Sequence, residues 1–148
     1  MNCLIYNQRN SKITQSCDLM GEKYRYSDIT GAVIGSAMHV HPELGDGFPE
    51  VIYQRSLAIE FQDQDICYQR ELSMPLHYKG KSVGKRRVDF LVEEKVLVEL
   101  KAVSEINDTH YNQILNYLTA YELEIGLLIN FGENSLKFKR FINSKFNR

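Results

Sequence analysis

The stretch Arg86–Val103 reads RRVDFLVEEKVLVELKAV, and it decides the fold. Two apolar runs rich in valine stand on either side of a polar turn at 94–95, a pattern that predicts two antiparallel strands. Before them, residues 66–78 (ICYQRELSMPLHY) have the same extended character and are separated from the first run by a turn at 79–80. We therefore expect a meander of three strands.

Charged residues interrupt both apolar runs. Asp89 lies within VDFLV, while Glu99 and Lys101 have only apolar neighbours in VLVELKAV. Side chains two positions apart on a strand point to the same face, so Glu99 and Lys101 are expected to lie side by side. Because an unpaired buried carboxylate costs several kcal/mol or becomes protonated, these charges predict a mutual or metal-bound arrangement. A simple ion pair of Lys101 with either carboxylate is the structural alternative.

Upstream, Ser27 and Asp28 are expected to cap a helix over residues 29–40, whose apolar residues recur at helical spacing. His41, Pro42 and the glycines of ELGDG are expected to end it. A second helix is predicted from Phe48-Pro49 to about Phe61. On it, Glu50 shares one face with three aromatic or aliphatic residues, so a carboxylate faces the core. Glu50 serving only the helix dipole is the alternative. Three inward carboxylates and a lysine suit magnesium or manganese, and not zinc.

Downstream, a capped amphipathic helix is expected over 109–123, followed at 124–132 by a nearly all-apolar strand buried on both faces in the middle of a sheet. Residues 135–142 alternate as a final edge strand or form a short closing element. The predicted fold class is α/β, a central mixed β-sheet flanked by helices in the order α-α-β-β-β-α-β. We expect a single domain over 24–148, with 1–23 as a poorly patterned extension.

Composition narrows the function classes. The chain has 148 residues, no apolar run of membrane-spanning length and no signal-peptide pattern at its start, so a cytoplasmic location and no membrane partner are expected. The net charge is −1, but two segments, Lys79–Arg87 and Lys137–Arg148, are basic without any acid. They are either ordinary solvated surface or a binding surface for nucleic acid. The candidate phosphate contacts are Lys79, Lys81, Lys85, Arg86 and Arg87.

These motifs resemble a known group of proteins. Asp89 followed by Glu99-Leu100-Lys101 is similar to the D…ExK core of the PD-(D/E)XK nuclease superfamily, and Gln113 to Tyr117 matches the QxxxY helix of many members. Residues 47–53, GFPEVIY, spell GxxExxY. With the DITG, RRVDFLV, VELKA and GLLINFG blocks, this heptad resembles the small bacterial GxxExxY protein family. The similarity covers roughly residues 24–143.

The resemblance implies a nuclease-like fold and a role for each matching residue. One departure is that Val88 replaces the proline of the superfamily's name, a common substitution. The implied metal ligands for Mg²⁺ or Mn²⁺ are Asp89, Glu99 and Glu50, and Lys101 would assist the base or stabilise charge. The implied supporting residues are Gln113, Tyr117 and Tyr53.

Three hypotheses stay open at this point. The first is metal-dependent hydrolysis of phosphodiester bonds in DNA or RNA. The second is a non-catalytic module that keeps the nuclease fold to bind nucleic acid or protein, and the third is a buried charge network with a structural role only. Because so short a chain has no separate recognition domain, a homodimer or a partner protein would have to supply any sequence selectivity.

Overall fold

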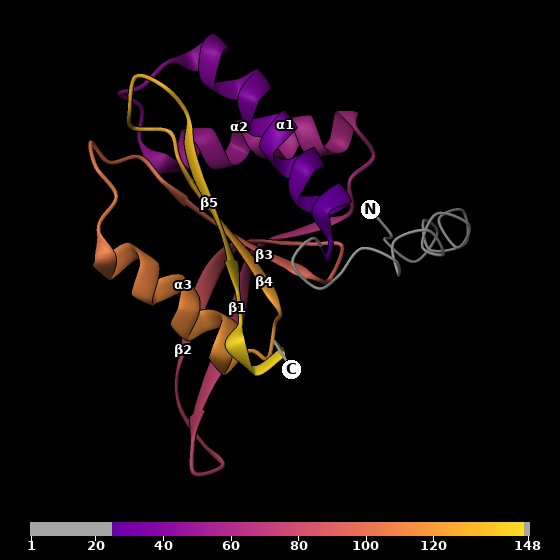
Figure 1. Cartoon of the computed structure of the whole chain (residues 1–148), viewed down its shortest axis with the longest axis vertical. Helices are drawn as coiled ribbons and strands as arrows, with labels where there is room; N and C mark the ends of the chain where they lie inside the picture. Colours follow the sequence, from indigo (N-terminus) through magenta and orange to yellow (C-terminus); the bar gives the residue numbers. More distant parts are fainter. Residues whose placement is uncertain (1–24, 147–148) are drawn as a thin grey trace.

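The computed structural model describes residues 25–146 (Figure 1), so the extension predicted over 1–23 lies outside the described residues. Helices and strands follow the predicted order. They are α1 (Ser27–Leu44), α2 (Glu50–Asp63), β1 (Tyr68–Tyr78), β2 (Lys81–Val92), β3 (Val96–Lys101), α3 (Asp108–Ala120), β4 (Ile125–Asn130), β5 (Lys137–Ile142) and a short 3-10 turn, η4 (Ser144–Phe146).

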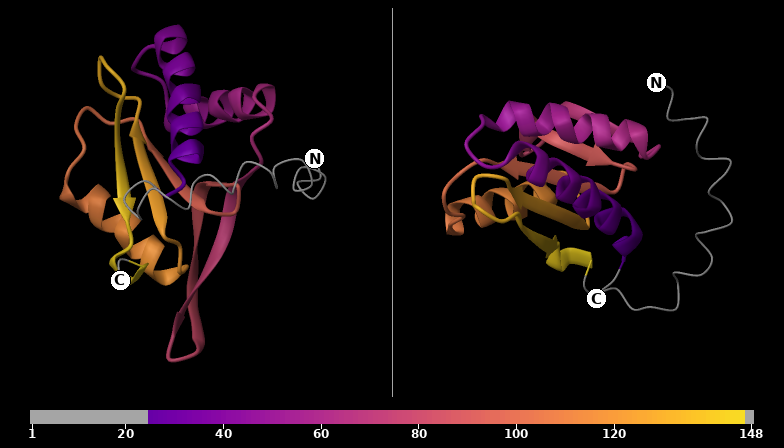
Figure 2. Two further views of the ribbon diagram at one scale, coloured as in Figure 1. Left: turned by 45° about the vertical axis from the view of Figure 1, so that its right-hand side comes forward. Right: turned by 90° about the horizontal axis from the view of Figure 1, so that it is seen from above.

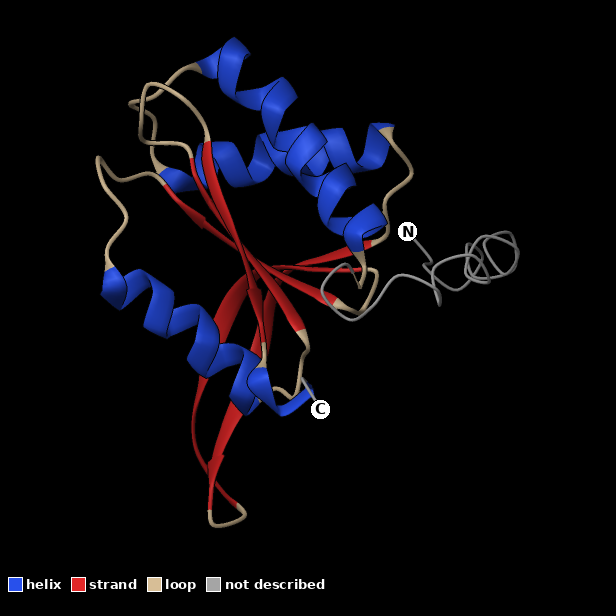
Figure 3. Cartoon of the chain, in the orientation of Figure 1, coloured by secondary structure: helices blue, strands red, loops and turns tan. Residues whose placement is uncertain are grey.

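The five strands form one sheet in the order β1-β2-β3-β4-β5. Strands β3 and β4 run parallel and the other neighbours run antiparallel, which confirms the mixed sheet. Every residue of β4 is buried, as its apolar sequence predicts. Residues 137–142 form an edge strand, the first of the two outcomes expected for this segment. Helices α1 and α2 cover one face of the sheet and α3 covers the other (Figure 3).

The end of α1 was predicted one turn too early. The helix continues through Pro42 to Leu44 and stops where Gly45 adopts a φ of 70°. A proline in the last turn removes only one backbone hydrogen bond, whereas a left-handed φ is readily adopted by glycine and breaks the helical repeat. Gly45 therefore ends this helix. None of the helices within residues 25–146 is long and apolar enough to span a bilayer.

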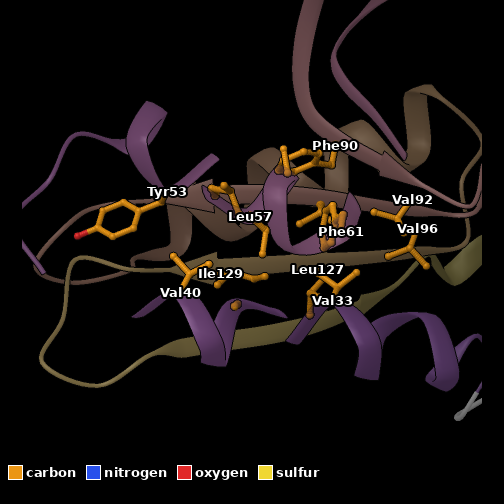
Figure 4. Close-up of a cluster of buried hydrophobic side chains, with 14 of the residues drawn as sticks. Val33, Val40, Tyr53, Leu57, Phe61, Phe90, Val92, Val96, Leu127 and Ile129 are labelled. Atoms are coloured by element: carbon orange, nitrogen blue, oxygen red, sulfur yellow. The ribbon is translucent and has the colours of Figure 1, made fainter. Parts of the chain in front are cut away.

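Two apolar clusters hold the layers together. The larger lies between α1, α2 and the sheet, and includes Val33, Leu57, Phe61, Phe90 and Leu127 (Figure 4). The smaller lies between α3 and the other face of the sheet. Strand β3 alternates between them, as a period of two requires, and fully burying one such side chain stabilises the fold by about 1.5–3 kcal/mol.

Strands β1 and β2 form a long hairpin that extends beyond the rest of the sheet (Figures 1 and 2). We call residues 73–87 the arm. Residues 81–87 are all exposed, whereas β2 becomes buried from Val88 onward. At the base of the arm, the Tyr121 hydroxyl donates a hydrogen bond to the Met74 carbonyl at 3.1 Å, which ties the arm to the end of α3.

Candidate active site

The candidate site lies where β2 separates from β3. The two strands pair backbone to backbone only as far as Phe90 opposite Val98. At Asp89, the residue before Phe90, hydrogen bonds to side chains take the place of backbone pairing between the two strands. The Asp89 N–H donates to Glu99 Oε1 at 3.3 Å, and the Leu100 N–H donates to Asp89 Oδ2 at 2.8 Å. These two exchanges hold the carboxyl groups of Asp89 and Glu99 next to each other.

Gln54 completes the support of Asp89, and sequence reasoning missed it. Its Nε2 donates to Asp89 Oδ1 at 2.7 Å, and the side chain is buried on α2, one turn after Glu50. Both oxygens of Asp89 therefore accept a hydrogen bond that fixes the carboxylate in place. The available signal was the spacing of four residues from Glu50, which puts Gln54 on the core-facing side of the helix.

Glu99 lies in a strongly perturbed environment, with only 6% of its surface exposed. Burial, followed by the negative charge of Asp89, raises the pKa of Glu99 to about 9, although the hydrogen bond from the Asp89 N–H and the charge of Lys101 oppose the shift. Glu99 is consequently protonated at neutral pH in the metal-free protein.

Glu50 on α2 and Lys101 on β3 both interact electrostatically with the carboxyl groups of the site. The pKa of Glu50 is raised by burial and by Asp89, and lowered by Lys101, so all three groups are within electrostatic range. Within residues 25–146, the only ion pairs closer than 4.0 Å are Arg25–Glu124 and His39–Glu60. Lys101 therefore does not form the simple ion pair considered as the structural alternative.

Tyr53 fixes the loop that leads into Glu50. The ring is fully buried and stacks on Phe131 with the ring centroids 4.6 Å apart. Its hydroxyl donates to the Gly45 carbonyl at 2.5 Å and accepts from the Phe48 N–H at 3.3 Å. Because these bonds close the loop just before α2, Tyr53 positions the first turn of that helix and does not touch the carboxylates itself.

The α3 side of the site is aromatic. Gln113 Nε2 donates to the Tyr117 hydroxyl at 3.1 Å, as their spacing on one helical face predicts. One turn later, the pKa of Tyr121 is raised by burial first, then by Tyr117 and by Glu99, and lowered by Arg86. Tyr121 is therefore in electrostatic range of Glu99, although within the described part of the chain neither tyrosine donates a hydrogen bond to Glu99.

The five basic candidates do not gather at the carboxylates. All of them are exposed on the arm or at its turn. Arg86 and Arg87 come just before Asp89, but Lys81 is eight residues away along β2, about 25 Å at 3.3 Å per residue. Of the five predicted phosphate contacts, two lie next to the site. The other three, Lys79, Lys81 and Lys85, lie further out along the arm.

The donor set is made of oxygen. Asp89 and Glu99 converge, and Glu50 interacts electrostatically with Asp89. Within residues 25–146, however, no three His, Cys, Asp or Glu side chains lie close enough together to hold a metal ion, so the structure does not bring the three predicted ligands into one group. Carboxylate oxygens are the ligands that magnesium and manganese prefer. The type of ligand atom that these residues offer therefore suits a hard divalent cation.

The fold and the site together define a nuclease-like α/β protein, with paired carboxylates and a lysine at the point where two strands separate. Comparison of the sequence with protein-family models agrees. The model of the PD-(D/E)XK nuclease superfamily matches residues 27–141, and the chain belongs to that superfamily.

No curated protein matches the chain. Among solved structures, the chain is similar to the crystal structure of SSO0001, with 17% sequence identity and a TM-score of 0.49 over 80% of this chain and 60% of that one. The chain thus spans less than two thirds of the length of that solved relative.

Proposed function

We propose that this protein is a metal-dependent nuclease that hydrolyses phosphodiester bonds of DNA or RNA. The observation that carries the proposal is the meeting of Asp89 and Glu99 where β2 separates from β3, with Lys101 and Glu50 in electrostatic range. The heptad from Gly47 to Tyr53 supports membership of the bacterial GxxExxY family within the superfamily.

The site is suited to a cation because the carboxyl groups of Asp89 and Glu99 meet there, and within residues 25–146 neither forms an ion pair closer than 4.0 Å. Asp89 and Glu99 would hold Mg²⁺ or Mn²⁺, with Glu50 contributing from α2. When bound, such an ion polarises a phosphoryl oxygen and lowers the pKa of a coordinated water. The raised pKa of Glu99 supports this assignment, because a divalent ion would favour the charged form that burial disfavours.

The residues of the chain itself would divide the remaining work. The ammonium group of Lys101, which no carboxylate holds at close range within residues 25–146, would orient the attacking water or stabilise charge that develops on the phosphoryl group. Gln54 and the Leu100 N–H keep the Asp89 carboxylate in one orientation. Tyr53 holds the loop that delivers Glu50.

The arm supplies the second half of the proposal. Its exposed cations, Lys79, Lys81, Lys85, Arg86 and Arg87, lead from solvent to Asp89 along one hairpin. Contacts of this kind bind phosphates without reading bases, so binding should be sensitive to salt and largely independent of sequence.

The decisive experiment compares Lys101→Ala with wild-type protein on labelled DNA and RNA in Mg²⁺ and in Mn²⁺. We expect Lys101→Ala to lose cleavage by at least about 100-fold, in the range found when a group that stabilises transition-state charge is removed. Its Tm should stay near that of wild type. Lys95→Ala, an exposed lysine in the turn at the other end of β3, is the matched control and should cleave normally.

Two results would contradict the proposal. One is a folded wild-type protein that cuts no DNA or RNA with either ion, and the other is undiminished cleavage by Lys101→Ala.

A non-catalytic module is the second candidate, because the exposed arm would bind phosphates whether or not turnover follows. Calorimetry separates the two candidates, since the nuclease requires Mg²⁺ or Mn²⁺ binding that Asp89→Asn weakens, and the module does not.

A further inference from the structure

A cavity of about 320 Å³ opens between the start of α3, the loop before it and strands β4 and β5. It does not contain the carboxylates of the candidate site. We call it the side pocket and define it by the residues used below: Glu105, Tyr111, Leu128, Glu133, Lys137 and Lys139.

Sheet register places the side pocket beside Lys101 on the same face of the sheet. Residues paired across neighbouring strands point to the same side, and adjacent strands are about 4.8 Å apart. Two rows of paired residues therefore run across β3, β4 and β5 from the site into the pocket. Strand β5, the far wall of the pocket, is about 10 Å from β3. The rows are Lys101–Asn130–Lys137 and Glu99–Leu128–Lys139.

The side pocket combines an aromatic surface with cations. Lys139 Nζ lies 4.2 Å from the centroid of the Tyr111 ring, and Leu128 adds buried apolar surface. The ammonium group covers one face of the ring, and when it turns to a phosphate that face is open for an unpaired base to stack on. Lys137, two residues before Lys139 on β5 and on the same face, adds a second positive charge.

The acids of the side pocket make the ligand class more specific. Two carboxylates, Glu105 and Glu133, would weaken the binding of a lone anion at Lys137 and Lys139. A carboxylate accepts well from exocyclic amino groups such as N4 of cytosine. A nucleotide carries a phosphate for the lysines and, in several bases, an amino group for the acids, so it fits the mixed charges better than a simple anion does.

We infer that the side pocket receives the unpaired nucleotide next to the scissile phosphate, so that the substrate is single-stranded nucleic acid or the frayed end of a duplex. This inference rests on the proposed nuclease function. A volume of about 320 Å³ is at the small end of the range for ligand pockets. It is of the size of one nucleotide and smaller than two paired nucleotides.

Cleavage kinetics test the inference with matched variants. The same labelled strand is offered alone and as a blunt duplex in Mg²⁺ or Mn²⁺. Wild-type protein should cleave the single strand at least about ten-fold more efficiently, and Lys139→Ala and Tyr111→Leu should each remove about ten-fold of kcat/KM on that strand, chiefly through KM. Lys95→Ala is the control, because Lys95 lies over Tyr26 in a similar contact, 5.3 Å from the ring centroid.

A binding measurement keeps this inference separable from the proposed function. Deoxycytidine monophosphate is titrated into Lys101→Ala protein by calorimetry, and Lys139→Ala in that background should weaken binding about ten-fold. Equal cleavage of single strand and duplex, or pocket variants that match wild type while Lys101→Ala is inactive, would overturn the inference and leave the nuclease standing. If no cleavage occurs at all, the nuclease proposal fails and the nucleotide titration alone decides the pocket. Lys139→Ala changes an exposed side chain, so the test does not depend on Tyr111→Leu folding.

Discussion

Glu99 holds a proton at neutral pH because burial and the charge of Asp89 raise its pKa to about 9. In the unfolded chain the same group loses its proton near 4.5. Between these two values the folded state binds one proton more, so the free energy of unfolding of the metal-free protein should fall as pH rises, by several kcal/mol in all. Glu99→Gln should flatten this dependence. Urea unfolding of both proteins in chelator from pH 5 to pH 9 measures it.

A cation should reverse the preference of Glu99 for its proton. Binding of Mg²⁺ requires the charged carboxylate, so affinity should rise with pH and binding should release protons. If the free energy of unfolding of metal-free wild-type protein and of Glu99→Gln changed with pH in the same way, Glu99 would not be the group that holds the proton.

Gln54 is expected to act as a positioning residue. Gln54→Ala removes the donor to Asp89 Oδ1, which should lower the free energy of unfolding by about 1–2 kcal/mol and weaken Mg²⁺ binding by about 10–100-fold. Calorimetric metal titration and urea unfolding report the two effects separately. Gln64→Ala, an exposed glutamine at the end of the same helix, is the control. Equal metal affinity for both variants would limit Gln54 to a structural role.

The difference between Gln54 and the charged residues shows what the sequence makes visible. Asp89, Glu99 and Lys101 could be identified because a charge inside an apolar strand is costly and requires a reason. An amide carries no such penalty once it is hydrogen-bonded, and its partner is 35 positions away along the chain. The sequence showed that Asp89 was special, but only the structure showed what holds it.

At the scale of elements, the connection after β3 depends on Gly132. A Cβ added there would lie 2.4 Å from the backbone N and O of Val103. Val103 cannot withdraw easily, because Asn130 binds both its N–H and its carbonyl. Gly132→Ala should therefore lower the Tm sharply and disturb the segment that follows Lys101.

Gly126→Ala is the comparison for Gly132→Ala within the same strand region. Its Cβ would meet side-chain atoms of Ile114 and Leu118 at 3.0–3.1 Å, and side chains can rotate where backbone cannot. Thermal unfolding should rank wild type above Gly126→Ala and Gly126→Ala above Gly132→Ala. The reverse order for the two variants would contradict this account of the connection.

Element types followed from periodicity, and geometry between elements did not. The extended character of β1 and β2 predicted strands, and the apolar run of β4 predicted a strand buried inside the sheet, both of which the structure confirms. The sequence did not reveal that β2 pairs with β3 only from Phe90 onward, because the end of a ladder depends on how the whole sheet twists. The end of α1 was placed too early because His41 and Pro42 were counted with the glycines as ending the helix, whereas the helix continues to Leu44 and stops at Gly45.

At the scale of the whole molecule, the arm should control the salt dependence of nucleic-acid binding. Replacing Lys79, Lys81 and Lys85 by alanine should weaken binding and reduce the slope of log affinity against log salt by up to about 3. The Tm should hardly change, since all three side chains are exposed. Fluorescence anisotropy from 50 to 300 mM salt measures the slope, and an unchanged slope would place the phosphate contacts elsewhere. The net charge of −1 concealed this surface until the position of each cation was considered.

Asp89 takes part in folding as well as in the proposed chemistry, because it links α2, β2 and β3 through its hydrogen bonds, whereas Lys101 has no close ionic partner within residues 25–146. A lineage that abandoned catalysis would thus be free to exchange its lysine long before its aspartate. In descendants of such an ancestor, an intact aspartate therefore says little about whether activity is retained. Replacement of the lysine would be the first sign that catalysis had been lost.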